Sequence, residues 1–176
     1  EETAVNGRWV KGPGEKFFSA IKKELGEVPF IAEDLGHITP EVIELKNRFS
    51  FPGMKVMQFC MENKPGAKFS LPLYEKNTVV YTGTHDNDTI LGWYRKYNES
   101  DDSSPEDICW HYIEEAMRSD ARMVIIPLQD ILCLDNDARM NVPGTVGDNW
   151  QWRFPEGCIS KETELKLADL TKRMNR

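Results

Sequence analysis

Short apolar runs alternate with amphipathic segments along this chain, and this alternation constrains its fold more than any other feature. The runs expected to form strands lie at residues 28–32, 54–59, 78–81 and 124–128. Apolar residues at helical spacing predict helices at residues 15–25, from 40 to 49, around 90–94, from 105 to 117 and from 160 to 174. Strands separated by helices predict βα units. Strands that are apolar throughout are typical of a parallel sheet with both faces covered.

Two of the expected helices begin with a strong local signal. Thr39 and Ser104 are each followed by proline and then glutamate. This order provides a capping hydroxyl, a proline suited to the first helical position and an acid near the positive end of the helix. In the last helix we expect Leu165, Leu167 and Ala168 to pack inward.

The alternation of strands and helices, without a low-complexity tract or an interior linker, predicts one α/β unit that spans residues 1–176. The formal net charge is -7 and there is no Lys/Arg stripe, which argues against binding to nucleic acid. No apolar run approaches the ~18 residues of a membrane span. The four cysteines form no CxxC pair, so we expect reduced and mostly buried thiols rather than metal ligands.

Two polar clusters each follow an expected strand. Glu33 and Asp34 come after residues 28–32, and the sequence HDND at residues 85–88 comes after residues 78–81. In α/β barrels the carboxyl ends of the strands carry the chemistry. Carboxylates from nearby strands could face one sugar-sized ligand, and paired carboxylates suit cleavage of a glycosidic bond.

Each cluster has a competing interpretation. Glu33 could be a salt-bridged acid of a loop. His85 and Asp86 could belong to a metal-dependent phosphohydrolase, although only His37 and His111 remain as further histidine ligands. Asp88 could simply cap the following helix.

Five blocks in order resemble glycoside hydrolase family 77. They are GRWV with GPG at residues 7–14, IAEDLG with ITPEV at 31–42, FPGMKVMQF at 51–59, YTGTHDNDT with LGWY at 81–94, and ARMN, PG and NWQWR at 138–153. The resemblance covers essentially the whole chain. It implies the C-terminal half, strands five to eight with their helices, of a (β/α)8 TIM-type barrel.

The resemblance also implies residue roles in transfer of α-1,4-glucan segments by a retaining double displacement. Glu33 matches the general acid/base, and Asp86 matches the transition-state stabiliser. The remaining matched residues are expected to contact the glucan: His85, Asp34, Phe59, Asn141 and Trp9. No metal or organic cofactor is implied.

The implied partners are α-1,4-glucans of maltotriose length or longer, glucose as acceptor, and the N-terminal half of the same barrel; no nucleic acid or membrane is implied. The family's nucleophilic aspartate, carried in an Arg-Ile-Asp-His-type segment, is missing from these 176 residues, so we expect the isolated chain to be inactive. The alternatives are an α-glucan hydrolase of the α-amylase superclan and a non-catalytic glucan-binding fragment. The motifs favour plastid stroma, with bacterial cytoplasm as the alternative location.

Overall fold

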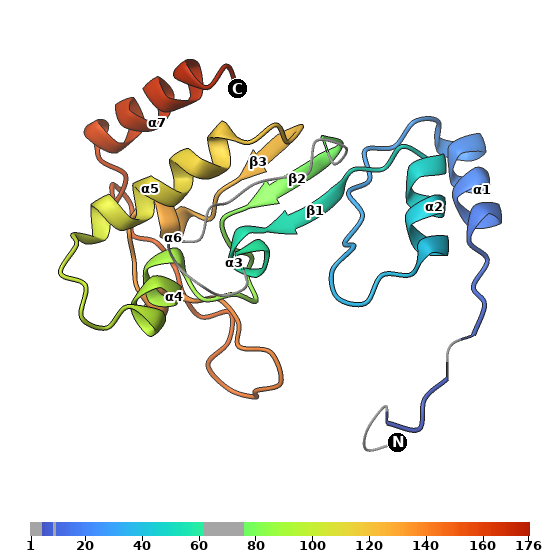
Figure 1. The fold of residues 1–176 in the computed structure, drawn as a ribbon, viewed down its shortest axis with the longest axis horizontal. Coiled ribbons are helices and arrows are strands. Elements are labelled where there is room, and N and C mark those ends of the chain that lie inside the picture. The colour runs from blue at the N-terminus through green and yellow to red at the C-terminus, as the bar shows by residue number, and fades with distance from the viewer. Residues whose placement is uncertain (1–4, 9, 62–75) are drawn as a thin grey trace.

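The centre of the molecule is a small parallel sheet (Figure 1). The computed structural model describes residues 5–8, 10–61 and 76–176. Within these residues the strands are β1 (Gly53–Val56), β2 (Thr78–Tyr81) and β3 (Met123–Ile125), in the order β1-β2-β3. The register pairs Val56 with Tyr81, and Tyr81 with Ile125. The carboxyl ends of the three strands therefore meet at one edge of the sheet.

Helices precede, separate and follow these strands. They are α1 (Glu15–Leu25), α2 (Pro40–Arg48), α3 (Met57–Cys60), α4 (Ile90–Tyr97), α5 (Pro105–Arg118), α6 (Leu128–Ile131), the 3-10 helix η2 (Asn136–Ala138) and α7 (Lys161–Arg173). The starts expected at Pro40 and Pro105 are confirmed, and the Ser104 side chain caps α5 by accepting a hydrogen bond from the Asp107 amide. None of the described helices has the length and apolar character required to cross a bilayer.

One face of the sheet carries the main core. Val80 and Val124 are partners in the register, and both contact the apolar cluster formed by α4 and α5. Trp93 and Tyr112 pack edge to face within this cluster, with ring centroids 5.4 Å apart. The expectation for α7 was wrong for Leu165 and Ala168, which are exposed, because Leu167 and Leu170 turn toward α5 instead.

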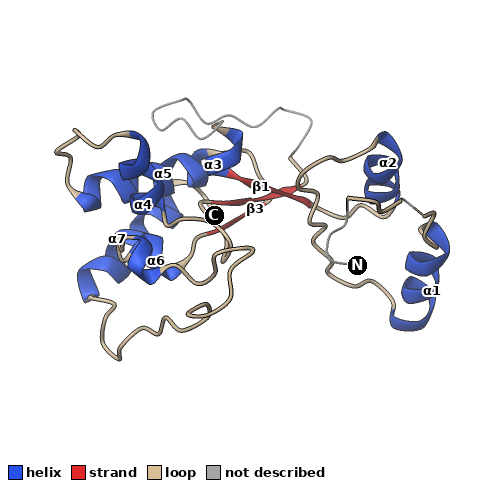
Figure 2. Cartoon of the chain, turned by 90° about the horizontal axis from the view of Figure 1, so that it is seen from below, coloured by secondary structure: helices blue, strands red, loops and turns tan. Residues whose placement is uncertain are grey.

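The helices α1 and α2 lie apart from the other helices, beyond the start of β1 (Figures 1 and 2). Neither helix has a buried residue. A cluster of four phenylalanines, with ring centroids 5.0 to 6.2 Å apart, joins them to the segment before Glu33; its members are Phe18, Phe30, Phe49 and Phe51. This satellite cluster positions the approach to the first polar cluster.

The strand expected at residues 28–32 is wrong. The Ala32 amide donates to the Pro52 carbonyl at 2.8 Å, so the segment runs beside the start of β1. Pro29 has no N–H to donate, and the Phe30 amide is used in a local bond to the Val28 carbonyl. Too few donors remain for a ladder.

The strand expected at residues 78–81 is confirmed as β2, whereas β1 and β3 are shorter than expected. Residues 57–60 form α3 rather than the end of a strand, and Pro127 ends the apolar run after β3 and precedes α6. The cysteines match expectation in part. Cys109 is buried, Cys133 and Cys158 are half-buried, and Cys60 is exposed.

Candidate active site

Glu33 is placed by its neighbour Asp34. One oxygen of the Asp34 carboxylate accepts a 2.8 Å hydrogen bond from the Met54 amide, and the other lies 2.6 Å from Lys46 Nζ. A Cβ at Gly53 would come within 2.4 Å of the same carboxylate, so only glycine allows this approach. With Asp34 held against β1, the side chain of Glu33 is left to face the open space over the sheet.

His85 and Asp86 lie on a tight loop that leaves β2. The Asn87 side-chain oxygen accepts hydrogen bonds from the Thr84 amide at 3.0 Å and from the Thr84 hydroxyl at 2.6 Å. The buried Gln58 side chain donates to the Asp88 carbonyl at 2.8 Å. These bonds fold the loop back on itself and tie it to α3.

The Asp86 carboxylate is oriented by two side chains. Asn141 Nδ2 donates a 2.7 Å hydrogen bond to Asp86 Oδ1, and His85 Nε2 lies 3.4 Å from the same oxygen. Arg139 donates to the Asp86 carbonyl at 2.6 Å and also pairs with the Asp88 carboxylate. The segment after η2 therefore fixes the loop that carries Asp86.

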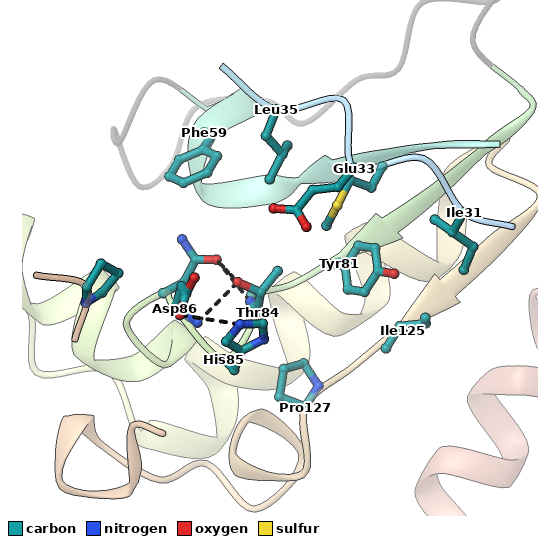
Figure 3. Close-up of a pocket in the computed structure, with 14 residues that line it drawn as sticks. Ile31, Glu33, Leu35, Phe59, Tyr81, Thr84, His85, Asp86, Ile125 and Pro127 are labelled. Carbon is teal, nitrogen blue, oxygen red and sulfur yellow. Dashed lines mark hydrogen bonds and ion pairs between the residues drawn. The ribbon is translucent and has the colours of Figure 1, made fainter. Parts of the chain in front are cut away.

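Both polar clusters open onto one cavity of about 540 Å³ (Figure 3). Glu33 and Phe59 line one side of it, and His85 and Asp86 line the other. Tyr81, at the end of β2, also lines the cavity, on the side of Ile31 and Ile125. Burial raises the pKa of Tyr81, and the negative charge of Glu33 raises it further. The phenol and the carboxylate therefore interact electrostatically.

The cavity contains four of the residues expected from the sequence: Glu33, Phe59, His85 and Asp86. Asn141 is linked to them through its bond to Asp86. Asp34 lies elsewhere, because its nearly buried carboxylate is turned toward Lys46 and Met54. Trp9 lies outside the described residues.

Asp88 does not cap the following helix. Thr89 takes that position, with its hydroxyl accepting a hydrogen bond from the Gly92 amide at 3.1 Å. Asp88 pairs with Arg139 instead. No group of three or more His, Cys, Asp and Glu side chains suited to a metal ion occurs in the described residues.

Three residues near the cavity were not predicted as site residues. Tyr81 ends an apolar run and was assigned to the strand alone. Arg139 binds the Asp86 carbonyl across 53 residues of sequence, and no local pattern reveals this contact. The ring of Trp150 lies 5.1 Å from that of His85, and its positive φ of 65° marks a constrained turn.

The comparisons with known proteins give one family. The model of the 4-alpha-glucanotransferase family matches residues 1–160. The Streptococcus pneumoniae 4-alpha-glucanotransferase is 47% identical over 97% of this chain and 36% of its own length. The Thermus thermophilus enzyme is 45% identical over 98% of this chain and 38% of its own length. A chloroplastic/amyloplastic enzyme of Arabidopsis thaliana is 44% identical over 96% of this chain and 31% of its own length.

A solved structure agrees with these relatives. The amylomaltase from Streptococcus agalactiae in complex with acarbose matches 99% of this chain with a TM-score of 0.83 and 35% identity, over 37% of that protein's chain. The present chain thus spans about a third of the length of the relatives it matches. With a family model that covers most of its length, and a fold and cavity built on the same motifs, this chain belongs to glycoside hydrolase family 77, the 4-alpha-glucanotransferases.

Proposed function

We propose that, in the complete protein that contains it, this chain supplies the proton donor and a substrate-orienting carboxylate for transfer of α-1,4-glucan segments. The observation that carries the proposal is the shared cavity: Glu33 and Asp86 come from different loops and face one space. Family membership supplies the reaction class. Malto-oligosaccharides of maltotriose length or longer are the proposed donors, and a glucan or glucose is the acceptor.

The proposed reaction is a retaining double displacement. Glu33 protonates the glycosidic oxygen while a carboxylate from outside residues 1–176 attacks the anomeric carbon and forms a glycosyl ester. Glu33 then takes the proton from the acceptor hydroxyl as this oxygen displaces the ester and restores the original anomeric configuration. The two carboxyl groups of such a pair lie about 5–5.5 Å apart, so the attacking group must come within about this distance of the Glu33 carboxyl group.

Asp86 is proposed to bind sugar hydroxyls more strongly in the transition state than in the ground state. Asn141 and His85 hold its Oδ1, which limits the rotation of the carboxylate. An oriented acceptor loses little entropy when the substrate arrives, and this supports the assignment. The similar amylomaltase was solved with acarbose, and we extend binding of that class of ligand to this cavity.

We also propose that the sheet belongs to a closed eight-stranded barrel completed by other residues. Its helix-free face carries Met54, Tyr81 and Ile125, and Met123 beside them is 48% exposed. The interior of a (β/α)8 barrel is filled with side chains, so this face requires a covering. A polypeptide of residues 1–176 alone is expected to show no transfer activity on maltotriose.

The test uses the complete protein and maltotriose. The wild-type protein should produce glucose and longer malto-oligosaccharides without an increase in total reducing ends. Glu33→Gln should lower the rate on the order of 10²–10⁴-fold while maltotriose binding persists. Asp86→Asn should lower it on the order of 10²-fold. Glu99→Gln, which changes an exposed acid between α4 and α5, serves as the matched control.

Two results would contradict the proposal. Transfer at the normal rate by Glu33→Gln would remove the acid/base assignment. A wild-type protein that only raises reducing ends would be a hydrolase. The plastid location favoured by the motifs stays a prediction, because bacterial and plastid relatives match this chain with similar identities.

A further inference from the structure

A buried carboxylate bridges the two ends of the loop that carries His85 and Asp86. Asp130 Oδ2 accepts a 2.5 Å hydrogen bond from the Thr82 hydroxyl, and Oδ1 accepts a 2.8 Å bond from the Ile90 amide. Thr82 directly follows β2, and Ile90 is the first residue of α4. Asp130 lies on α6, beyond β3. One side chain therefore connects a strand end, a helix start and a third element.

This bridge lies behind the site and outside the glucan cavity. Asp130 is 1% exposed and Thr82 is fully buried, so neither can contact a substrate. Asp130 instead borders a second cavity of about 150 Å³ underneath the loop, together with Thr84, His85 and Asp88. Any influence of Asp130 on the reaction must pass through the position of the loop.

The buried carboxylate is unfavourable by itself. Burial raises the pKa of Asp130 to about 6, and the two donors offset only part of this effect. An amide or apolar side chain would avoid this desolvation. What the side chain provides is two hydrogen-bonding atoms at a fixed separation, which set the distance between Thr82 and Ile90.

Other groups also hold this loop. At its ends, the Gln58 side chain donates to the Thr82 carbonyl at 3.5 Å, and the Thr89 amide donates to Asn136 Oδ1 at 3.1 Å. Gln58 binds the Asp88 carbonyl, and Arg139 binds the Asp86 carbonyl and the Asp88 carboxylate. Asp130 adds a bridge from Thr82 to the first residue of α4, so it fixes the separation between the end of β2 and the start of that helix.

We propose that Asp130, through Thr82 and the Ile90 amide, is a positioning residue that sets where Asp86 stands against the bound glucan. The inference rests on the proposed function of Asp86. It assigns a role in the reaction to a residue that never meets the substrate.

The test compares Thr82, which directly follows β2, with Thr78, the first residue of β2, in the complete protein. Thr82→Val removes the hydroxyl that reaches Asp130. Thr78→Val removes a buried hydroxyl that donates to the Gly53 carbonyl at 3.0 Å, at the opposite end of the same strand. The measurements are kcat and KM with maltotriose, the midpoint of thermal unfolding, and amide hydrogen exchange of a peptide covering residues 83–89.

We expect Thr82→Val to lower kcat on the order of 10- to 100-fold with little change in KM, and to speed exchange in residues 83–89. Both valine variants should lower the unfolding midpoint by similar amounts. Thr78→Val should leave kcat and the exchange of residues 83–89 unchanged. The single variants Thr82→Ser and Asp130→Asn should each keep most of the wild-type kcat. Serine keeps the hydroxyl, and the asparagine amide can donate to Thr82 while its oxygen still accepts from Ile90.

Equal losses of kcat in the two valine variants would overturn the proposal, because they would show a general effect of stability. A loss of kcat in both Thr82→Ser and Asp130→Asn that is as large as in Thr82→Val would overturn it as well. If the wild-type protein transfers no glucan, the proposed function fails, and the exchange data still decide whether Asp130 orders the loop. Unchanged exchange in Thr82→Val, in a protein that does transfer glucan, rejects the positioning role alone.

Discussion

Asn141 donates a 2.7 Å hydrogen bond to Asp86 Oδ1, across 55 residues of sequence. The bond joins the segment after η2 to the loop after β2. The backbone strengthens the same link, because the Asn141 amide donates to the His85 carbonyl at 3.0 Å. The orientation of the Asp86 carboxylate therefore depends on a segment that follows β3 in the chain.

Removal of the Asn141 amide should release this carboxylate. We expect Asn141→Ala to lower kcat/KM for maltotriose by about 10- to 100-fold, in line with loss of a hydrogen bond to a charged group. Asn141→Asp should be worse, because it places a second anion beside Asp86. The measurement is steady-state transfer by the complete protein. An Asp variant as active as wild type would show that the contact has no role.

The coupling of Tyr81 to Glu33 can be tested without any substrate. Glu33→Gln should lower the pKa of Tyr81, because a neighbouring anion no longer disfavours the phenolate. The pKa should stay above the ordinary value, since burial is the larger cause. NMR titration of the tyrosine ring carbon gives the value directly. Glu44→Gln, which alters an exposed acid of α2, should leave it unchanged.

Gly53→Ala tests the approach of Asp34 to β1. The new Cβ would lie 2.4 Å from the Asp34 carboxylate, which must then leave Met54 and Lys46. We expect a loss of about 1–3 kcal/mol in the free energy of unfolding in urea, together with reduced transfer as Glu33 shifts. Gly12→Ala is the matched control, because nothing lies within 4 Å of its added Cβ. Equal stability of the two variants would contradict the assigned packing.

Asp130 should give stability a distinctive pH dependence. Its pKa is about 6 in the folded state, against an ordinary value of 3.8. Between these two values the folded state holds a proton that the unfolded state has released. The resulting stabilisation is fully present below about pH 3.8 and is lost as the pH rises through about 6. Asp130→Asn lacks this dependence.

The free energy of unfolding of Asp130→Asn, relative to that of wild type, should therefore rise by roughly 2–3 kcal/mol as the pH increases from 4 to 7. Urea unfolding at the two pH values measures the difference. A constant difference between the two proteins would indicate that Asp130 has an ordinary pKa.

The parts of the fold that the sequence predicts are those with local causes. The helix starts at Pro40 and Pro105 follow from residues next to them in the chain. The strand at residues 78–81 was recovered because its apolar run has no competing donor or proline. Residues 28–32 look equally apolar, but Pro29 and the local bond of Phe30 remove them from the sheet. The hydrophobicity pattern of a sequence does not show that backbone N–H donors are missing.

The same division holds for the site. Glu33 and Asp86 could be selected because each follows an apolar run and belongs to a family block. Asp34 was assigned to the glucan because position alone cannot tell which way a side chain turns. Asp130 and Arg139 act across 40 to 53 residues, and nothing beside them in the chain marks that role.

The phenylalanine cluster has a consequence for the order of unfolding. All its members lie between Phe18 and Phe51, and it shares no residue with the cores under the sheet. Regions held by separate, small apolar clusters open as independent cooperative units at lower free energy than the main core. On warming, α1 and α2 should melt first and release Glu33, while β2 still presents Asp86. The thermal limit of catalysis is then set by four aromatic rings that lie outside the cavity.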